Sequence, residues 1–325
     1  MNAWPALRRP ASRNARPGVA LLLTLLVVGL LSVSVLSFIR LTSLETKVAD
    51  NAYTFTQAEI LARSGLKGAM TILAMDDNDF DALTDPWANF SRYAALASGL
   101  FEEGGFTGNI EDLSGRLNIN SLIDRNGLVD ANRLARFERL FNLLEFDPET
   151  IPAILDWLDA DDNPRLGGAE NQYYLALAKP YPCANGDLNT LGRILLIKGL
   201  GPAAFYGTKD RPGLANVVTV HSDGAVNINT AGETVLMSLD DDLTPGMARE
   251  IISHRALKPF ERLEDLKLIS SLTPEVLARI VGGLAVVSSH FCIRVEGRFR
   301  QAKVPLTAIV ERSRSGVKLI YYRAG

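Results

Sequence analysis

Residues 16–40 read RPGVALLLTLLVVGLLSVSVLSFIR, and this stretch decides how the rest of the chain is organised. There is no charged residue between Val19 and Ile39, and a helix of that length is about 31 Å long at 1.5 Å per residue. This is close to the hydrocarbon thickness of a bilayer, so the segment can span a membrane. Four arginines and no acidic residue precede it, which predicts a cytoplasmic N-terminus and a body beyond the membrane.

The position of the small residue distinguishes a cleaved secretory signal from a retained helix. A secretory signal carries a small-x-small cleavage site beyond its apolar run, but residues 37–41 read SFIRL and contain no such site. The small residue is Gly18, between the arginines and the apolar run. The stretch thus resembles the leader of type IV prepilins and pseudopilins, which a dedicated peptidase cuts after that glycine. We expect cleavage between Gly18 and Val19, with an uncleaved signal anchor as the alternative.

Composition sets limits on the body. The chain has 325 residues, of which 47% are hydrophobic, enough for one long or two ordinary domains beyond the anchor. The net charge of −3 becomes about −7 once the four leader arginines are removed, and an acidic exported body is a poor binder of polyanions. We expect a disulfide between Cys183 and Cys292, both on the periplasmic side, with two separate buried thiols as the alternative.

Hydrophobic periodicity divides the chain beyond the anchor. Apolar residues recur every three to four positions over 41–73 and no proline interrupts 19–75, which predicts one long helix that is amphipathic in its second half. Residues 101–119 read as a hairpin, helical patterns dominate 121–284, and three antiparallel strands are expected after Ser288. The predicted fold is α+β: a pilin-like long N-terminal helix with a small antiparallel sheet, interrupted by a large, mostly α-helical inserted domain.

The domain boundaries follow from these changes in pattern. Five segments are expected: a prepilin-type leader (1–18), a transmembrane helix (19–39), the first part of a pilin-like domain (40–120), an inserted α-helical domain (121–285), and the stranded second part of the pilin-like domain (286–325).

One short pattern occurs twice in the chain. Residues 117–121 and 226–230 both read apolar-Asn-Ile-Asn-Ser/Thr, and each is expected to be a strand that ends at a helix cap. Thr230 and Glu233 fit the capping box, in which a hydroxyl and a carboxylate satisfy the first free backbone N–H groups of a helix. Duplication of two helical subdomains is a second explanation for the repeat.

Several motifs together resemble the K-type minor pseudopilins of bacterial type II secretion, and the likeness covers the whole chain. They are the Gly18/Val19 junction, DLSGRLNIN at 112–120, DWLDAD at 156–161, GAE at 168–170, PY at 180–181 and VNINTA at 226–231. The resemblance implies a pilin-like sheet domain with an inserted α-domain. It also implies an inner-membrane protein with a periplasmic body, processed by prepilin peptidase and placed at the pseudopilus tip to initiate or cap assembly.

The resemblance further implies a set of partners. These are the I- and J-type minor pseudopilins, the major pseudopilin, the prepilin peptidase and the inner-membrane secretion platform.

Leu23 is the marker of the tip position. In most pilins the fifth mature residue is a glutamate that meets the N-terminal ammonium of a neighbouring subunit, and here that position is Leu23. An insertion of 165 residues, 121–285, should also clash with neighbours inside a tightly wound shaft. Val19 stands where many pilins have phenylalanine, so methylation of its amino group is an expectation from the family alone.

The sharpest local signal is the acidic segment 159–170, DADDNPRLGGAE. On the calcium-loop template it supplies five ligands: Asp159, Asp161, Asn163, the carbonyl of Arg165, and Glu170. Pro164 replaces the glycine of the template and forbids its left-handed turn, so the segment is not a true EF-hand. We expect Ca²⁺ here, in keeping with the family, with Asn185 and Asp187 as further candidate ligands. The alternative is a solvated acidic loop.

A second constellation, 227–266, resembles the helix-hairpin-helix module of DNA-uptake receptors. Its hairpin, LTPGM at 243–247, lacks one of the two glycines whose backbone N–H groups face phosphate, and three aspartates stand before it at 240–242. Phosphate would be repelled, so we do not expect nucleic-acid binding. A membrane-anchored periplasmic receptor that binds DNA or protein through these helices is the alternative function.

No enzyme signature is found in the sequence. His221, His254 and His290 are far apart and near no nucleophile, metal-protease or phosphate-loop motif. We therefore predict no catalytic residues.

Overall fold

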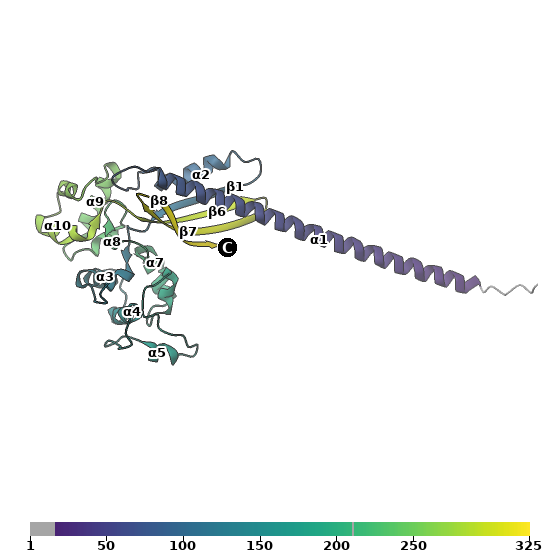
Figure 1. Cartoon of the computed structure of the whole chain (residues 1–325), viewed down its shortest axis with the longest axis horizontal. Helices are drawn as coiled ribbons and strands as arrows, with labels where there is room; N and C mark the ends of the chain where they lie inside the picture. The colour runs from purple at the N-terminus through teal and green to yellow at the C-terminus, as the bar shows by residue number, and fades with distance from the viewer. Residues whose placement is uncertain (1–16, 210) are drawn as a thin grey trace, which may run out of the picture. The chain divides into compact units, whose positions relative to one another are not determined.

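The computed structural model describes residues 17–209 and 211–325, so the leader up to Arg16 lies outside the described residues. The chain divides into two compact units, one ending at Thr56 and one comprising Gln57–Gly325. The larger unit contains every strand and all the helices that follow α1 (Figure 1).

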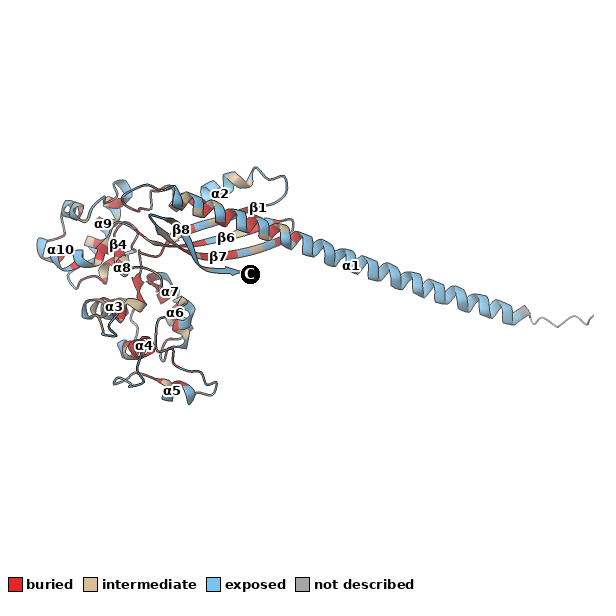
Figure 2. Cartoon of the chain, viewed as in Figure 1, coloured by how far each residue is buried: buried red, intermediate tan, exposed pale blue. Residues whose placement is uncertain are grey.

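Helix α1 (Pro17–Ala74) confirms the predicted long helix. Its most apolar 18-residue window has a mean hydropathy of 2.8, and none of that window is buried. Figure 2 shows this exposure along the N-terminal half of the helix. By length and composition this part of α1 could cross a membrane.

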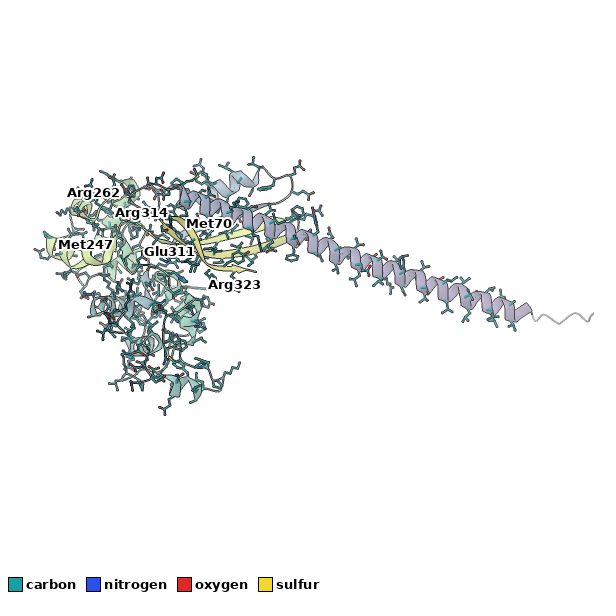
Figure 3. All side chains as sticks on the ribbon, viewed as in Figure 1. Met70, Met247, Arg262, Glu311, Arg314 and Arg323 are labelled. Atoms are coloured by element: carbon teal, nitrogen blue, oxygen red, sulfur yellow. The ribbon has the colours of Figure 1, made fainter. Side chains whose placement is uncertain are left out.

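Beyond Gln57, α1 packs closely on the sheet through small residues. A Cβ added at Gly65 would lie 2.7 Å from side-chain atoms of Phe106 and Val295, and one added at Gly297 would lie 2.0 Å from the carbonyl oxygen of Ala58. Met70 is partly buried against the core that this contact creates (Figure 3). The small residues therefore let the helix backbone approach the strands closely.

The sheet has four antiparallel strands in the order β1-β6-β7-β8. They are β1 (Gly105–Asp112), β6 (His290–Phe299), β7 (Ala302–Ser313) and β8 (Gly316–Ala324). The three strands predicted after Ser288 are confirmed. β1 and β6 pair side by side although residues 113–289 lie between them in the sequence, which confirms the predicted insertion.

The hairpin predicted over residues 101–119 is wrong. Residues 105–112 form the single strand β1, which pairs with β6, and the chain then leaves the sheet. Residues Leu117–Asn118 then pair with Val218–Thr219 and not with β1, so the turn at Ser114-Gly115 carries the chain into the insertion.

The insertion is mostly helical, as predicted, and has its own hydrophobic core, which runs from Leu117 to Leu284. The short helices outside it, η1 (Pro86–Asn89) and α2 (Phe90–Ser98), contact β1. The helices of the insertion are η2 (Ile119–Leu122), α3 (Ala131–Leu143), η3 (Pro148–Thr150), α4 (Ile151–Leu158), α5 (Asn171–Leu175), η4 (Leu191–Leu196), α6 (Pro202–Tyr206), α7 (Leu214–Val217), α8 (Glu233–Met237), α9 (Pro245–Leu257), η5 (Leu263–Leu268), α10 (Pro274–Ile280) and η6 (Val281–Gly283).

The repeated Asn-Ile-Asn pattern has the same structure at both places. β2 (Leu117–Asn118) pairs in parallel with β3 (Val218–Thr219), and β4 (Val226–Asn227) pairs in parallel with β5 (Leu284–Ala285). In each copy the first asparagine accepts a hydrogen bond from the backbone N–H two residues later. The two copies therefore share a short parallel strand and the asparagine hydrogen bond that follows it, and duplication of a subdomain stays a prediction.

The second asparagine of each copy holds a distant backbone segment. Asn120 donates to the carbonyl of Leu188 and accepts from its N–H, and Asn229 does the same with Phe260. The predicted capping box is wrong, because α8 begins only at Glu233 and the hydroxyl of Thr230 donates to Asp112.

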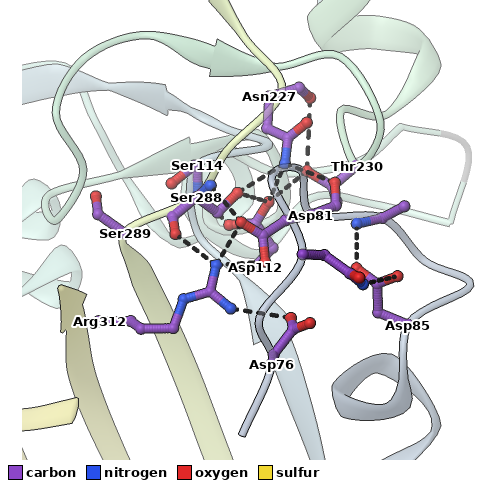
Figure 4. A network of polar contacts seen from close by, with 12 residues as sticks. Asp76, Asp81, Asp85, Asp112, Ser114, Asn227, Thr230, Ser288, Ser289 and Arg312 are labelled. Atoms are coloured by element: carbon purple, nitrogen blue, oxygen red, sulfur yellow. Dashed lines mark hydrogen bonds and ion pairs between the residues drawn. The ribbon is translucent and has the colours of Figure 1, made fainter. Parts of the chain in front are cut away.

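A buried polar network joins the insertion to the sheet where the chain enters and leaves it (Figure 4). Asp112, at the end of β1, accepts hydrogen bonds from the hydroxyls of Thr230 and Ser288. The amide of Asn227 donates to Ser288 Oγ at 2.7 Å and to the carbonyl of Asp81 at 3.1 Å. Both crossing points are therefore tied to the loop that follows α1.

Arg312 supplies the positive charge of this network. Its guanidinium forms ion pairs with Asp76, at 3.0 Å, and with Asp81. Burial raises the pKa of Asp81 to about 6, because the loss of hydration outweighs the attraction of Arg312. Burial likewise raises the pKa of Asp112.

Candidate functional site

Three buried carboxylates gather where α4 ends and α5 begins. Asp156 is in the last turn of α4, Asp159 is its C-cap residue, and Glu170 is the N-cap residue of α5. Each offers an oxygen within 4.8 Å of the others, and the residues are only 0%, 4% and 2% exposed. We call this set the carboxylate triad.

The loop between Asp159 and Glu170 wraps around Asp156. The Asp156 carboxylate accepts hydrogen bonds from the backbone N–H groups of Arg165 and Ala169. A Cβ added at Gly168 would lie 1.8 Å from Asp156 Oδ2, so glycine is required for the loop to approach this closely. The sequence thus positions the triad through a glycine and two backbone donors.

The triad holds more negative charge than its surroundings neutralise. Arg165 is its one ion-pair partner in the described chain and contacts both Asp156, at 2.7 Å, and Asp159. Both oxygens of Glu170 and one oxygen of Asp159 are buried without a hydrogen-bond partner among the described residues. Burial, followed by the charges of Asp156 and Asp159, raises the pKa of Glu170 to about 7.

Buried carboxylate oxygens without donors are costly unless a cation is present. Oxygen-only ligands suit a hard cation such as Ca²⁺, and the orphaned oxygens of Glu170 and Asp159 point to the same chemistry. The residues present therefore fit a divalent ion.

The structure brings together two of the five predicted ligands, Asp159 and Glu170, and adds Asp156, which the calcium-loop template missed. Asp161 and Asn163 are exposed and lie outside the triad, and the Asp161 carboxylate accepts the backbone N–H of Asn163 instead. The physical reason is Pro164, which cannot make the left-handed turn that brings the early ligands of a calcium loop around one ion.

Arg165 also departs from its predicted role. It faces the triad with its guanidinium, while its carbonyl accepts the N–H of Gly168. Acid clustering in DWLDAD was the signal that could have revealed Asp156.

The two further candidate ligands occupy an outer position. Asn185 has a positive φ of 45° and donates from its amide to the carbonyl of Asp161 and the carboxylate of Asp162. Asp187 is exposed. Asn185 therefore stabilises the loop beside the triad, and its own buried Oδ1 has no partner in the described chain.

The predicted disulfide is wrong. Cys183 and Cys292 are both free and buried. Cys183 lies beside the triad, with its Sγ 3.8 Å from the carbonyl oxygen of Asp156, whereas Cys292 is in β6 and pairs across the sheet with Glu111 and Ile309. Cys183 belongs to the hydrophobic core of the insertion and Cys292 to strand β6 of the sheet, and burial raises the pKa of both thiols.

The helix-hairpin-helix region carries its acidic residues in ion pairs. Asp240 and Asp242 both contact Arg279, and Asp241 contacts Arg139. The hydroxyl of Thr244 caps α9 by accepting the N–H of Met247. The hairpin is thus a packed, acid-fronted turn, as the sequence indicated.

The three histidines have different surroundings. The ring of His254 stacks on Phe260, and burial, followed by the charge of His290, lowers the pKa of His221. The Nδ1 atom of His290 lies 2.8 Å from the hydroxyl oxygen of Ser289, which donates a hydrogen bond to Asp223.

Gly18 and Val19 lie in the first turns of α1, at the junction predicted for processing. Leu23 is 56% exposed in the apolar part of the helix, where most pilins carry a glutamate. Between Val19 and Ile39 the helix offers only uncharged side chains for contact with lipid or with other helices.

Two family models match parts of this chain, and curated proteins match nearly its whole length. Residues 115–207 match the family model described as type II secretion system protein K, and residues 221–285 match that of the helix-hairpin-helix motif. The chain is 28% identical to type II secretion system protein K of Pseudomonas aeruginosa, with 94% of this chain and 91% of that protein covered. It is 25% identical to protein K of Pectobacterium carotovorum, with 96% and 98% covered.

A solved structure shares the fold. It belongs to the GspK-GspI-GspJ complex from enterotoxigenic Escherichia coli, with a TM-score of 0.68 and 17% identity over 86% of this chain and 99% of that chain. The long helix, the small sheet and the helical insertion therefore recur in that protein. The resemblance predicted from the sequence is confirmed: this chain is a relative of the K-type minor pseudopilins of type II secretion.

Proposed function

We propose that the chain is held in the bacterial inner membrane by α1, with its body in the periplasm, and assembles at the tip of a secretion pseudopilus. The observation that carries this proposal is the end-to-end likeness to protein K combined with an apolar helix segment that has no buried residue in its most apolar window. A helix of that kind requires either lipid or other helices around it.

The tip position rests on two features of the chain. Leu23 removes the carboxylate that would set register with the next subunit, so no buried charge has to be paired at that depth. Residues 113–289 form an insertion with its own core, which makes this body much larger than a helix and a four-stranded sheet. A chain of this bulk fits the end of a helical stack better than its shaft.

The proposed partners are the I- and J-type minor pseudopilins. The structural neighbour was solved as a complex with GspI and GspJ, and the shared fold supports an equivalent assembly here. Contacts with the major pseudopilin, the prepilin peptidase and the secretion platform belong to the same proposal.

Purification of the full chain from detergent-solubilised membranes tests this assembly. The I- and J-type subunits should copurify with it, and labelling of intact pseudopili should find this chain at one end. Labelling along the whole shaft would contradict the proposal. Normal secretion by cells in which the chain lacks residues 19–39 would contradict it as well.

Calcium is proposed as the resident ion of the carboxylate triad. Asp156, Asp159 and Glu170 would hold it, and Arg165 would balance the remaining charge. When bound, the ion would neutralise the buried carboxylates and fix the loop between α4 and α5. Its role is structural.

Processing after Gly18 and methylation of Val19 are proposed from the resemblance. The alternative function, a membrane-anchored receptor that uses the helix-hairpin-helix region for DNA, is not favoured by the end-to-end likeness to protein K or by the aspartates that front the hairpin. Salt-sensitive retention of DNA by the full chain would support it.

A further inference from the structure

A solvent-accessible cavity lies at the side of the insertion, away from the carboxylate triad. Its volume is about 490 Å³, and its walls come from α3, the loop before β4 and the end of α10 with η6. Three arginines of α3, at positions 133, 136 and 139, line it, together with Arg279 of α10. Positions 133, 136 and 139 fall near one face of a helix, so α3 presents a row of guanidinium groups.

Three of these four arginines have carboxylate partners. Arg133 contacts Asp130 at 3.4 Å, Arg139 contacts Asp241 at 2.8 Å, and Arg279 contacts Asp240 at 2.7 Å. The charges of these three arginines are neutralised within the fold. The fourth arginine of the cavity is Arg136.

Arg136 has no ion-pair partner in the described parts of the chain, although it is only 8% exposed. Its one hydrogen bond runs from Nη1 to the carbonyl of Gly283 at 3.5 Å, the limit of such a bond. Burial, followed by the charge of Arg133, lowers the pKa of Arg136. A nearly buried cation without a counter-ion is costly.

Arg255 shows what a structural arginine looks like in this protein. It is also nearly buried and has no carboxylate partner among the described residues, but its two terminal nitrogens donate to the carbonyls of Ile228 and Ala231. Arg255 thus ties two turns together. Arg136 makes no comparable pair of bonds within the described chain, and it lines the cavity.

Two glycines make room for the guanidinium groups. A Cβ added at Gly283 would lie 1.9 Å from Arg136 Nη2, and one added at Gly224 would lie 3.0 Å from Arg133 Nη2. Gly224 also has a φ of +87°, which other residues rarely adopt. The guanidinium groups of Arg133 and Arg136 therefore lie against glycine backbone in the wall of the cavity.

We propose that this cavity binds a carboxylate, presented by an acidic side chain or the C-terminal end of another polypeptide, and that Arg136 is the residue that pairs with it. The planar guanidinium offers parallel donors that match the two oxygens of a carboxylate. One unpaired positive charge suits a monoanion. A dianionic phosphate would instead meet Asp130, Asp223 and Asp240 at the walls. This inference goes beyond the proposed function and requires neither calcium nor a tip position.

Peptide binding to the full chain in detergent tests the proposal. The probe is a fluorescently labelled, amidated pentapeptide with one central glutamate among glycines, and the matched peptide carries glutamine. The glutamate peptide should bind at least tenfold more tightly, and acetate at high concentration should compete with it. Equal binding of the two peptides, or competition by phosphate but not by acetate, would overturn the proposal.

Variants separate binding from folding. Arg136→Met should reduce binding of the glutamate peptide at least tenfold while the melting temperature stays equal to or above that of the wild type, because an unpaired charge has been removed. Arg255→Met should lower the melting temperature. Arg249→Met, an exposed residue of α9 outside the cavity, should leave binding unchanged. A marked loss of stability in Arg136→Met, or unchanged binding, would show that Arg136 is structural.

Discussion

The carboxylate triad of the insertion and the aspartates at its junction with the sheet are both buried acidic clusters, yet they differ in what surrounds them. The oxygens of Asp81 and Asp112 are met by Arg312, Ser288, Thr230 and Asn227. In the triad, the oxygens of Glu170 meet no donor in the described chain. Acidic residues alone therefore do not define an ion site: complete hydrogen bonding indicates a structural role, whereas oxygens without donors are the ones that a bound cation would satisfy.

The largest expected effect comes from removing the positive charge of the buried polar network at the junction. Arg312→Met should lower the free energy of unfolding by about 3–5 kcal/mol, because it leaves Asp76 and Asp81 buried without their cation. Urea denaturation of the full chain in detergent measures this. Arg249→Met, which removes an exposed pair with Glu233, is the matched control and should change stability by less than about 1 kcal/mol. Equal effects of the two variants would refute the role of the network.

The second effect distinguishes the triad from the junction. Calcium at a hundred times its dissociation constant should stabilise the body by about 2.7 kcal/mol relative to chelator, because it binds the folded state only. Glu170→Gln should remove this response, whereas Asp81→Asn should retain it. Thermal unfolding with calcium and with EGTA measures both variants, and a calcium response that survives in Glu170→Gln would place the ion elsewhere.

The third effect is a pH dependence of the junction. Because the pKa of Asp81 is raised to about 6 in the folded state, the folded chain holds a proton that the unfolded chain has released between about pH 4 and pH 6. The contribution of this group to stability therefore falls as pH rises through that window, by about 3 kcal/mol. The groups that face it are Asp76, Asp85, Asp112 and Arg312.

Stability curves of the wild type and Asp81→Asn, both in calcium, isolate this contribution. The stability of the wild type relative to Asp81→Asn should fall as pH rises from about 4 to about 6. Above that window the two curves should run parallel. Parallel curves throughout would mean that Asp81 keeps an ordinary pKa.

The smallest effect concerns the cysteines. Cys183 lies beside the triad and Cys292 in the sheet, so reduction should change the free energy of unfolding by less than about 0.5 kcal/mol. Titration of the unfolded, unreduced chain should find two reactive thiols. A titration that finds none would restore the bridge and would require the two regions to lie closer than the structure places them.

Periodicity in the sequence was sufficient for the architecture. The long helix, the helical insertion and the three final strands were all predicted, because the hydrophobic period of each segment can be recognised locally in the sequence. The hairpin was not predicted correctly, since pairing of β1 with a strand beyond residue 289 leaves no local trace. The same holds for the capping box, where Thr230 serves Asp112 across the junction.

The candidate ion site was predictable only in part, as a cluster of carboxylates. Asp159 and Glu170 were identified from the template, but the template counts positions along a loop that turns through glycine, and Pro164 changes that path. Asp156 belongs to helix α4 and not to the loop that the template describes. Arg136 stands out because it has no ion-pair partner in the described chain. Neither fact can be read from spacing alone.

Mass analysis of the N-terminus of this chain, isolated from native membranes, shows whether the apolar helix, freed of its basic leader, stays on the body as its anchor and assembly element. We expect a mature chain that begins at Val19 and still carries residues 19–39. An intact Met1, or a chain that begins beyond residue 40, would contradict it.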